Sequence, residues 1–293
     1  MIYILENDLL RVKISSLGAE MQSIRRLDDG TEYLWQGDAT YWARRASNLF
    51  PVCGRLTGGH YIYEGKKYEM GSHGFARGME WDVINQKTDA ITLQLKPTEE
   101  TLSQYPFQFV LEMTYTLAEE SLSVTTIVRN EGDTVMPFAV GGHPGFNVPL
   151  DDEGVFENYS LIFDEPCQPE WLDTTPDTCA FTGKIKELPL EENQRLPLRH
   201  SLFDGDAIFL RNTARGVALV SEVTNRQVHL AFPDSPFLGI WHTPNTEAPF
   251  VCIEPWVASP SPVGLPEDIM QKADMIHLNP NEGYRNTYVI TVK

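Results

Sequence analysis

Apolar side chains recur at every second position over a long central stretch of the chain, and this period is typical of strands rather than helices. In FQFVLEMTYTL, residues 107–117, the alternating positions run from Phe107 to Leu117. The same period resumes after the four residues AEES and runs from Leu122 to Val128. Two alternating runs across so short a break predict an antiparallel hairpin with one buried face.

Further short runs of the same period predict an all-β fold. They begin with a first strand at 10–14 and recur at 91–95, 217–219, 228–232 and 288–292. The one helix that the sequence predicts is LPEDIMQKADMIH, residues 265–277, with a proline near its start and acidic residues in its first turn. We therefore expect a single domain over residues 1–293, folded as a large antiparallel β-sandwich.

The composition narrows the classes of partner. Acidic residues outnumber basic ones, 41 to 23, for a formal net charge of −18 at pH 7. Nucleic acids and anionic membranes bind basic faces, so neither is an expected partner. The acidity also disfavours strongly anionic substrates unless a local arginine cluster overrides it.

Cysteine spacing and hydropathy indicate the compartment. The four cysteines are scattered without CxxC pairs, which predicts reduced thiols in the cytoplasm and no structural zinc site. No apolar run approaches the roughly 20 residues of a membrane span, and we expect no secretory signal.

The segment GGHPGFN, residues 141–147, holds the first candidate site residue, His143. Gly141 and Gly142 permit close approach of a neighbour where a Cβ would clash, and Pro144 favours extended backbone at His143. The pattern suits an imidazole aimed into a pocket. A histidine that only satisfies its own turn is the alternative.

Two neighbouring segments, NLFPVCGRL (48–56) and GSHGFARGMEW (71–81), contribute Arg55, His73 and Arg77. Both arginines have apolar neighbours in sequence, which is unusual for side chains that seek water. A forked guanidinium in such a place can recognise hydroxyl or carboxylate groups. The alternative is a pair of structural arginines bonded to backbone carbonyls.

The segment FVCIEPWVA, residues 250–258, predicts a strand that is apolar on both faces except at Glu254. A buried carboxylate must be paired, hydrogen-bonded or shifted to a higher pKa. A base of raised pKa suits proton abstraction near neutral pH. A buried salt bridge between Glu254 and an arginine is the alternative.

The order GR, HGFAR with a following tryptophan, GGHPGFN and IEPW resembles the aldose 1-epimerase (galactose mutarotase-like) superfamily, and most closely its less characterised aldose epimerase branch. The resemblance covers essentially the whole chain. It implies a β-supersandwich and cofactor-free interconversion of the α and β anomers of an aldose. It further implies that Glu254 takes the proton of the C1 hydroxyl and His143 protonates the ring oxygen, while His73 and Arg55 bind sugar oxygens. Such a reaction needs a base and an acid, which we expect on opposite sides of the C1–O5 unit.

The sequence also departs from the best-known galactose mutarotases. Their substrate-binding aspartate has no secure counterpart, and Asp206 is preferred here over Asp204. The segment around His143 differs too, so galactose is not assured as substrate. Aromatic side chains that can stack on a sugar ring are Trp81, Trp241, Phe75 and Phe146, with core packing as the alternative role.

Three other functions stay open at this point. A sugar-phosphate 1-epimerase, a related activity of the superfamily, would need a cationic pocket, for which the candidates are Arg44, Arg45, Arg55 and Arg77. A carbohydrate-binding protein without turnover would not need both Glu254 and His143. A metallohydrolase is disfavoured because no HxH or HExxH pair is present, so no metal or other cofactor is expected. The expected partner is a small sugar, bound by a monomer or a homodimer.

Overall fold

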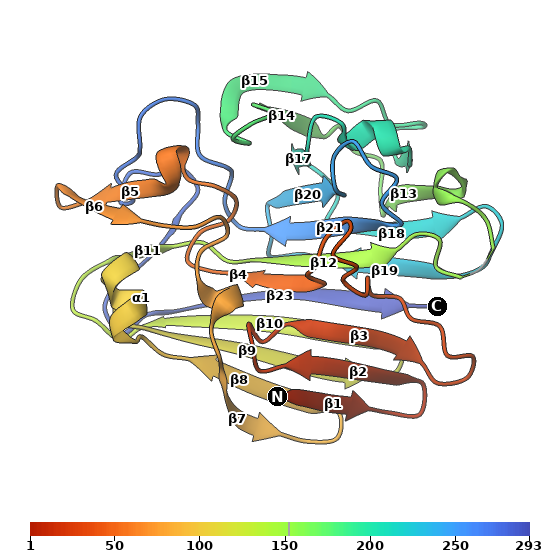
Figure 1. Cartoon of the computed structure of the whole chain (residues 1–293), viewed down its shortest axis with the longest axis horizontal. Coiled ribbons are helices and arrows are strands. Elements are labelled where there is room, and N and C mark those ends of the chain that lie inside the picture. The colour runs from red at the N-terminus through yellow and green to blue at the C-terminus, as the bar shows by residue number, and fades with distance from the viewer. Residues whose placement is uncertain (152) are drawn as a thin grey trace.

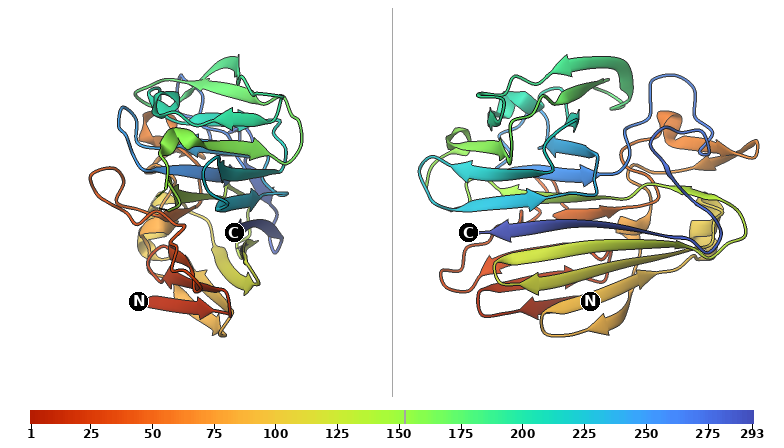
Figure 2. Two further views of the ribbon diagram at one scale, coloured as in Figure 1. Left: turned by 90° about the vertical axis from the view of Figure 1, so that its right-hand side faces the viewer. Right: turned by 180° about the vertical axis from the view of Figure 1, so that it is seen from behind.

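Two large antiparallel sheets dominate the computed structural model, which describes residues 1–151 and 153–293 (Figure 1). The nine-stranded sheet has the order β16-β13-β18-β19-β23-β10-β9-β8-β7. Its strands are β7 (Asp82–Gln86), β8 (Ala90–Leu95), β9 (Phe109–Ala118), β10 (Ser121–Asn130), β13 (Tyr159–Phe163), β16 (Arg195–Pro197), β18 (Gly216–Ser221), β19 (Gln227–Ala231) and β23 (Gly283–Val292). Seen from behind, β23, β10 and β9 run side by side along the molecule (Figure 2).

The seven-stranded sheet, of order β15-β14-β17-β20-β21-β12-β4, forms the second layer. Its strands are β4 (Ala46–Leu49), β12 (Gly141–Asn147), β14 (Glu170–Thr174), β15 (Phe181–Glu187), β17 (Ile208–Arg211), β20 (Phe237–Trp241) and β21 (Phe250–Trp256). Two neighbouring strands of this sheet, β12 and β21, carry the candidate site residues His143 and Glu254.

Smaller elements complete the fold. A three-stranded sheet of β1 (Ile2–Glu6), β2 (Leu10–Ser15) and β3 (Met21–Arg26) lies beside β8, β9 and β10 (Figures 1 and 2). There are also two two-stranded sheets: the hairpin of β5 (His60–Tyr63) with β6 (Lys66–Glu69), and the long-range pair of β11 (Met136–Phe138) with β22 (Ile276–Leu278). The helices are short: α1 (Glu99–Gln104) and the 3-10 turns η1 (Thr57–Gly59), η2 (Ala76–Gly78), η3 (Phe156–Asn158) and η4 (His200–Phe203). Within the part of the chain that the structure describes, no helix has the length and apolarity of a membrane span.

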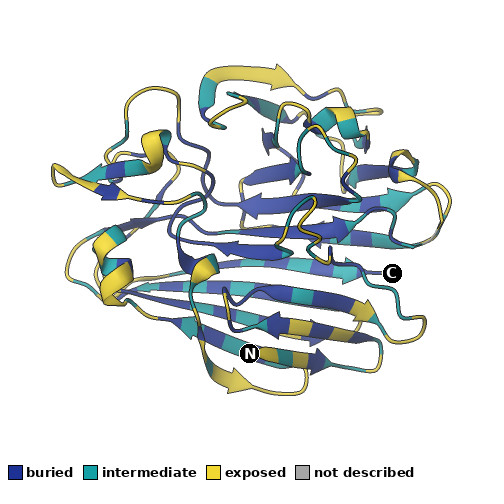
Figure 3. Ribbon diagram, in the orientation of Figure 1, coloured by how far each residue is buried: buried dark blue, intermediate teal, exposed yellow. Residues whose placement is uncertain are grey.

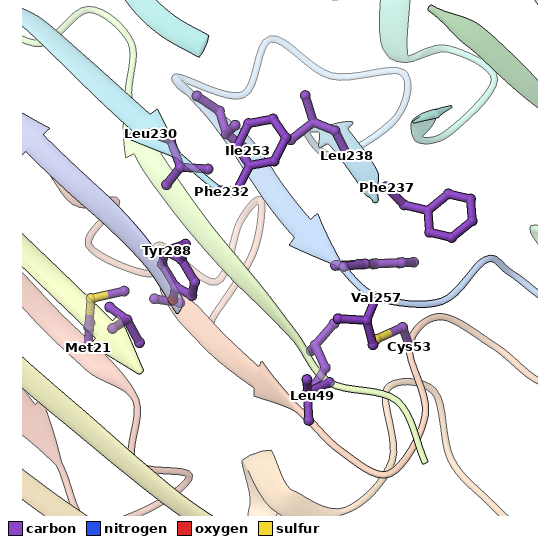
Figure 4. Close-up of a cluster of buried hydrophobic side chains, with 14 of the residues drawn as sticks. Met21, Leu49, Cys53, Leu230, Phe232, Phe237, Leu238, Ile253, Val257 and Tyr288 are labelled. Atoms are coloured by element: carbon purple, nitrogen blue, oxygen red, sulfur yellow. The ribbon is translucent and has the colours of Figure 1, made fainter. Parts of the chain in front are cut away.

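The core lies between the layers. Figure 3 shows buried residues concentrated along the central strands, with exposed residues at the turns and outer edges. Figure 4 shows part of this core, with Leu230 and Tyr288 from the nine-stranded sheet and Leu49, Leu238 and Ile253 from the seven-stranded sheet. Burial of these apolar faces is the main favourable contribution to the fold.

The predicted β-sandwich is confirmed. The hairpin expected at 107–128 is the β9–β10 pair, with Leu117 opposite Leu122. The runs at 217–219 and 228–232 pair as β18 and β19. The run at 10–14 is β2, and β1 before it was not predicted.

The helix predicted at 265–277 is wrong. This segment runs alongside β5 instead: the amide of Ile62 donates to the carbonyl of Glu267, and the amide of Ile269 donates to the carbonyl of Ile62. Backbone groups committed to a neighbouring strand are not available for helical hydrogen bonds, so tertiary pairing overrides the local pattern. The helix that does form, α1, begins with a capping box at Thr98 and was not predicted.

Candidate active site

One cavity of about 490 Å³ brings together the site residues predicted from distant parts of the sequence. All six candidates line it: Arg55, His73, Arg77, His143, Asp206 and Glu254. The cavity size is within the range of small-molecule sites. The wall also includes residues that the sequence did not single out, among them Trp42, Cys179, Phe209 and Trp256.

The neighbouring strands β12 and β21 fix the relative position of His143 and Glu254. In the antiparallel pairing of β12 with β21, Gly141 is opposite Trp256 and Gly145 is opposite Cys252. The same register places His143 opposite Glu254. Side chains that face each other across such a ladder project from the same side of the sheet, so strand pairing itself juxtaposes an imidazole and a carboxyl group.

The glycines around His143 make room for two indole rings. A Cβ added at Gly141 would lie 2.7 Å from Cδ1 of Trp256, and one added at Gly145 would lie 3.2 Å from Cζ3 of Trp42. Both glycines share a face with His143 because side chains alternate along a strand. The close approach expected in this segment is therefore real, and the histidine is a strand residue rather than a turn residue.

His143 and Glu254 contact each other directly, with Nε2 3.3 Å from Oε2. Both are buried, and the Trp42 ring stacks on the imidazole with 4.8 Å between ring centroids. Within the described ranges no arginine nitrogen lies within 4 Å of a carboxyl oxygen of Glu254. The alternative considered for Glu254, a buried salt bridge with an arginine, is therefore wrong. The sequence analysis expects an acid and a base on opposite sides of the C1–O5 unit, and in the structure the two groups belong to adjacent positions of paired strands. Because O1 and O5 are bonded to the same carbon, one neighbouring pair can serve both.

Burial favours the uncharged forms of this pair. It lowers the pKa of His143 to about 3 and, with the nearby negative charge of Asp206, raises the pKa of Glu254 well above its usual value. Both shifts favour a neutral imidazole beside a protonated carboxyl group.

His73 presents a single ring nitrogen to the cavity. Its amide donates to the carbonyl of Gly54 at 2.7 Å, and its Nδ1 accepts from the amide of Gly54 at 3.2 Å. Because Nδ1 is an acceptor, Nε2 carries the hydrogen. Burial keeps the pKa of His73 well below its usual value, and the neighbouring His143 adds to this effect. The residue is thus a neutral donor, and its φ of +63° is held by these two bonds to Gly54.

The predicted cationic cluster is only partly assembled. Arg55 and Arg77 line the cavity. Arg44 lies beside Arg77 and donates from Nη1 to its backbone carbonyl at 3.1 Å. Arg45 does not line this cavity, because its Nη1 donates to Gln22 on β3 at 2.8 Å.

Asp206, rather than Asp204, lines the cavity. Two donors hold its carboxylate: Trp241 Nε1 at 2.8 Å to Oδ1, and the Cys179 thiol at 2.7 Å to Oδ2. Trp241 lines the cavity as well and meets the His143 ring edge-on. The other aromatic candidates, Trp81, Phe75 and Phe146, are packed in the hydrophobic core.

The structure also brings together three potential metal-ligating side chains that the spacing of residues in the sequence did not reveal. One ligand atom each of His143, Cys252 and Glu254 lie within 4.8 Å of one another, a set that can hold a metal ion in principle. No HxH or HExxH pattern announces it, because its members come from two strands. Burial raises the pKa values of both Cys252 and Glu254 well above normal. A metal ion would have to displace both of these protons on binding.

The family model described as aldose 1-epimerase matches residues 1–291. The chain belongs to the aldose 1-epimerase family. Membership makes it an isomerase of the epimerase type.

Relatives of this aldose 1-epimerase family member cover nearly its full length. The plasmid-encoded protein LacX of Lactococcus lactis subsp. lactis is 33% identical over 295 residues, with 98% of each chain covered. A galactose mutarotase related enzyme from Lactobacillus acidophilus superposes with a TM-score of 0.94 at 32% identity, covering 100% of this chain and 97% of the other. A galactose mutarotase-like protein from Lactobacillus casei gives a TM-score of 0.93 at 33% identity and full coverage of both chains.

Proposed function

We propose that the protein interconverts the α and β anomers of an aldohexose by acid–base ring opening at the His143–Glu254 pair. The observation that carries this proposal is the 3.3 Å contact between a buried imidazole and a buried carboxyl on the wall of the cavity. Two titratable groups whose pKa values are shifted in this way mark a site of proton transfer.

In the ring-opening step the proton of the C1 hydroxyl passes to Glu254, and protonated His143 gives a proton to O5. The C1–O5 bond breaks as the C1=O1 double bond forms, which leaves the open-chain aldehyde. Rotation about C1–C2 presents the other face of the carbonyl. The same transfers in reverse close the ring as the other anomer and restore both residues.

Burial places the shared proton on Glu254 in the empty cavity, as the directions of the two pKa shifts require. Glu254 therefore acts as the base once this proton has moved across the contact to His143. The sugar can assist, because its hydroxyl groups solvate the ion-pair form.

The remaining wall residues suit the binding of a polyhydroxyl ring. His73 donates from Nε2 to a sugar oxygen, Arg55 offers further donors, and the Asp206 carboxylate accepts from sugar hydroxyls. Trp241 offers an apolar face for the ring carbons. The four free thiols support the cytoplasmic setting predicted from the sequence.

A carbohydrate-binding protein without turnover is the competing hypothesis. A buried Glu–His contact costs free energy that binding alone does not require, since neutral donors and acceptors satisfy hydroxyl groups equally well. That cost favours the catalytic proposal.

The test is the exchange rate between anomers, measured by proton NMR for a panel of aldoses with and without protein. We expect acceleration that falls by at least about a hundredfold in Glu254→Gln and in His143→Asn, with sugar binding retained in Glu254→Gln. Glu222→Gln, which alters an exposed carboxylate paired with Arg195, is the matched control. Unchanged turnover in Glu254→Gln would remove the residue from the mechanism, and binding without any acceleration would favour the carrier role.

A further inference from the structure

The imidazole of His143 lacks the bond that an acid–base histidine ordinarily makes. Such a histidine usually donates from its second ring nitrogen to a carboxylate or a carbonyl group, and that bond stabilises the protonated ring. Here Nδ1 is buried, and no group of the described residues lies in hydrogen-bonding geometry to it. The carbonyl group of His143 itself favours a proton on the ring, but it does not meet Nδ1 in that geometry. The protein therefore supplies no such bond to the protonated ring.

The titratable and charged groups around His143 give the protonated ring little help. Those that face it are Glu254 and Cys252 of β21, His73 of the loop after β6, Arg77 of η2 and Arg44 of the loop before β4. Arg77 and Arg44 lower the pKa of His143 in addition to the effect of burial. Burial raises the pKa of Cys252 and lowers that of His73, so both stay neutral. Among these groups, only Glu254 can provide a counter-charge, and only after it has given up its proton.

The ring of Trp42 covers one face of this imidazole. The two ring centroids lie 4.8 Å apart, with 27° between the ring planes. A cation over the face of an indole, within about 6 Å of its centroid, is attracted by the negative charge of the π system. A low dielectric constant strengthens that attraction in a buried site. Trp42 therefore has a contact through which it can stabilise an imidazolium.

The fold holds Trp42 in this position. The loop 35–45 is tied to Gly145 of β12, because the amide of Trp35 donates to the Gly145 carbonyl at 2.9 Å and the amide of Gly145 donates to the Arg45 carbonyl at 2.8 Å. Within the loop, Nε1 of Trp35 donates to the Trp42 carbonyl at 2.8 Å. A Cβ at Gly145 would lie 3.2 Å from Cζ3 of Trp42, so this glycine leaves room for the ring. Gly145 shares a face of the strand with His143, and the indole is thereby fixed over the imidazole.

We infer that Trp42 is a positioning residue that acts through His143: the face of its indole stabilises the protonated imidazole during ring opening and closure. The inference rests on the proposed function, because it assigns a partner to the acid of that reaction. In the empty cavity the proton lies on Glu254, and the active form has it on His143. A π face beside the imidazole lowers the free energy of this active form. Loss of that face should slow turnover rather than weaken sugar binding.

Two other roles of Trp42 have to be separated from this one. A stacked ring also holds an imidazole in one orientation by its shape alone. Trp42 lines the cavity as well, so contact with the sugar is a further role. The electrostatic role depends on the charge of the π face, the steric role depends on the shape of the ring, and a sugar contact acts on KM. Fluorine on the indole withdraws charge from the π face and changes the shape very little, so it separates the three.

The experiment replaces Trp42 with tryptophans that carry one to four ring fluorines, introduced at this position by nonsense suppression. Proton NMR measures kcat and KM for anomer exchange of an aldose whose turnover slows in deuterated water, so that proton transfer limits kcat. We expect kcat to fall with each added fluorine, by about threefold to thirtyfold over the whole series. KM should change by less than about twofold.

Controls test whether the effect belongs to this contact. The same fluorinated series at Trp171 is the matched control, because that ring faces the Lys186 ammonium at 5.1 Å and does not line the cavity. Its kcat should not change. Trp42→Phe keeps an aromatic face and should retain more activity than Trp42→Leu. Melting temperatures equal to that of wild type show that the fluorinated proteins keep the fold.

The outcomes separate failure of this inference from failure of the proposed function. A wild-type protein that accelerates anomer exchange of no aldose would remove the proposed function, and the inference with it. Acceleration by wild type with a kcat that stays flat across the fluorine series would overturn the role of Trp42 alone. A change confined to KM would place the ring against the sugar, and an equal slope at Trp171 would show a non-specific effect. Either of these results also overturns the inference.

Discussion

His143 and Glu254 face each other across the pairing of β12 with β21, and Nε2 of one lies 3.3 Å from Oε2 of the other. Each residue belongs to a strand with a neighbour on both sides, so the separation is fixed by a hydrogen-bonded ladder rather than by a loop. Sites on such rigid elements hold reacting groups more accurately than sites on loops. Because the two groups are this close, their protons titrate as a property of the pair.

The kcat/KM for a neutral sugar should keep its value well below the ordinary histidine pKa of 6.5. Catalysis needs one proton on the pair. A second proton adds to His143 only near its lowered pKa of about 3, and the last proton leaves Glu254 only at its raised pKa. The acid limb should therefore lie near pH 3, below the ordinary pKa values of both residue types. Anomer exchange measured across the pH range is the check, and a midpoint at the ordinary histidine value would contradict the assignment.

Glu254→Gln should stabilise the protein as it inactivates it. Because the folded-state pKa of Glu254 is raised, the native protein keeps a proton that the unfolded chain releases above pH 4.5. Stability is therefore lost as pH rises from that value toward the folded pKa. Glutamine does not titrate, so the variant should gain about 1 kcal/mol or more relative to wild type at pH 8 and much less at pH 5. Urea unfolding at the two pH values measures this, and a gain independent of pH would show that the carboxyl is not strained by burial.

Gly142 should be intolerant of a side chain. A Cβ there would lie 2.8 Å from the hydroxyl oxygen of Tyr288, on the face of β12 turned toward β23. Overpacking of this kind costs about 1–3 kcal/mol, so Gly142→Ala should unfold at a lower temperature. Gly71→Ala is the control, since no heavy atom lies within 4 Å of its added Cβ. Equal melting temperatures for the two variants would contradict the close packing.

The large sheets could be predicted from the sequence because the pattern that defines each strand lies within a single short segment. Alternation over 107–128 is enough to define a hairpin, and the apolar run at 250–256 is enough to define a buried strand. The segment at 265–277 failed because its backbone pairs with Ile62, some 200 residues away, which no local pattern reveals. Similarly, Glu254 stood out as a polar residue in an apolar strand, whereas Trp42 and Cys179 carry no local signal. Only the register and the long connections bring those two to the cavity.

Cys179 should act as a positioning residue for Asp206. The carboxylate is held by two donors, Trp241 Nε1 at Oδ1 and the Cys179 thiol at Oδ2. The backbone of Asp206 has a φ of +79°, a conformation that a non-glycine residue adopts at a cost, so contacts must hold it. Burial, reinforced by Asp206, raises the pKa of Cys179 to about 12. The thiol therefore stays protonated and remains a donor throughout the working pH range.

Removing the thiol donor of Cys179 should weaken substrate binding more than it slows the chemical step. In Cys179→Ala we expect KM to rise by about three- to tenfold with a smaller change in kcat, as the loss of one hydrogen bond implies. Cys179→Ser keeps a donor and should recover most of the loss, which a purely structural role for the sulfur would not produce. Cys167→Ala, a thiol that does not line the cavity, serves as the control. Equal kinetics for the alanine and serine variants would show that Trp241 alone holds the carboxylate.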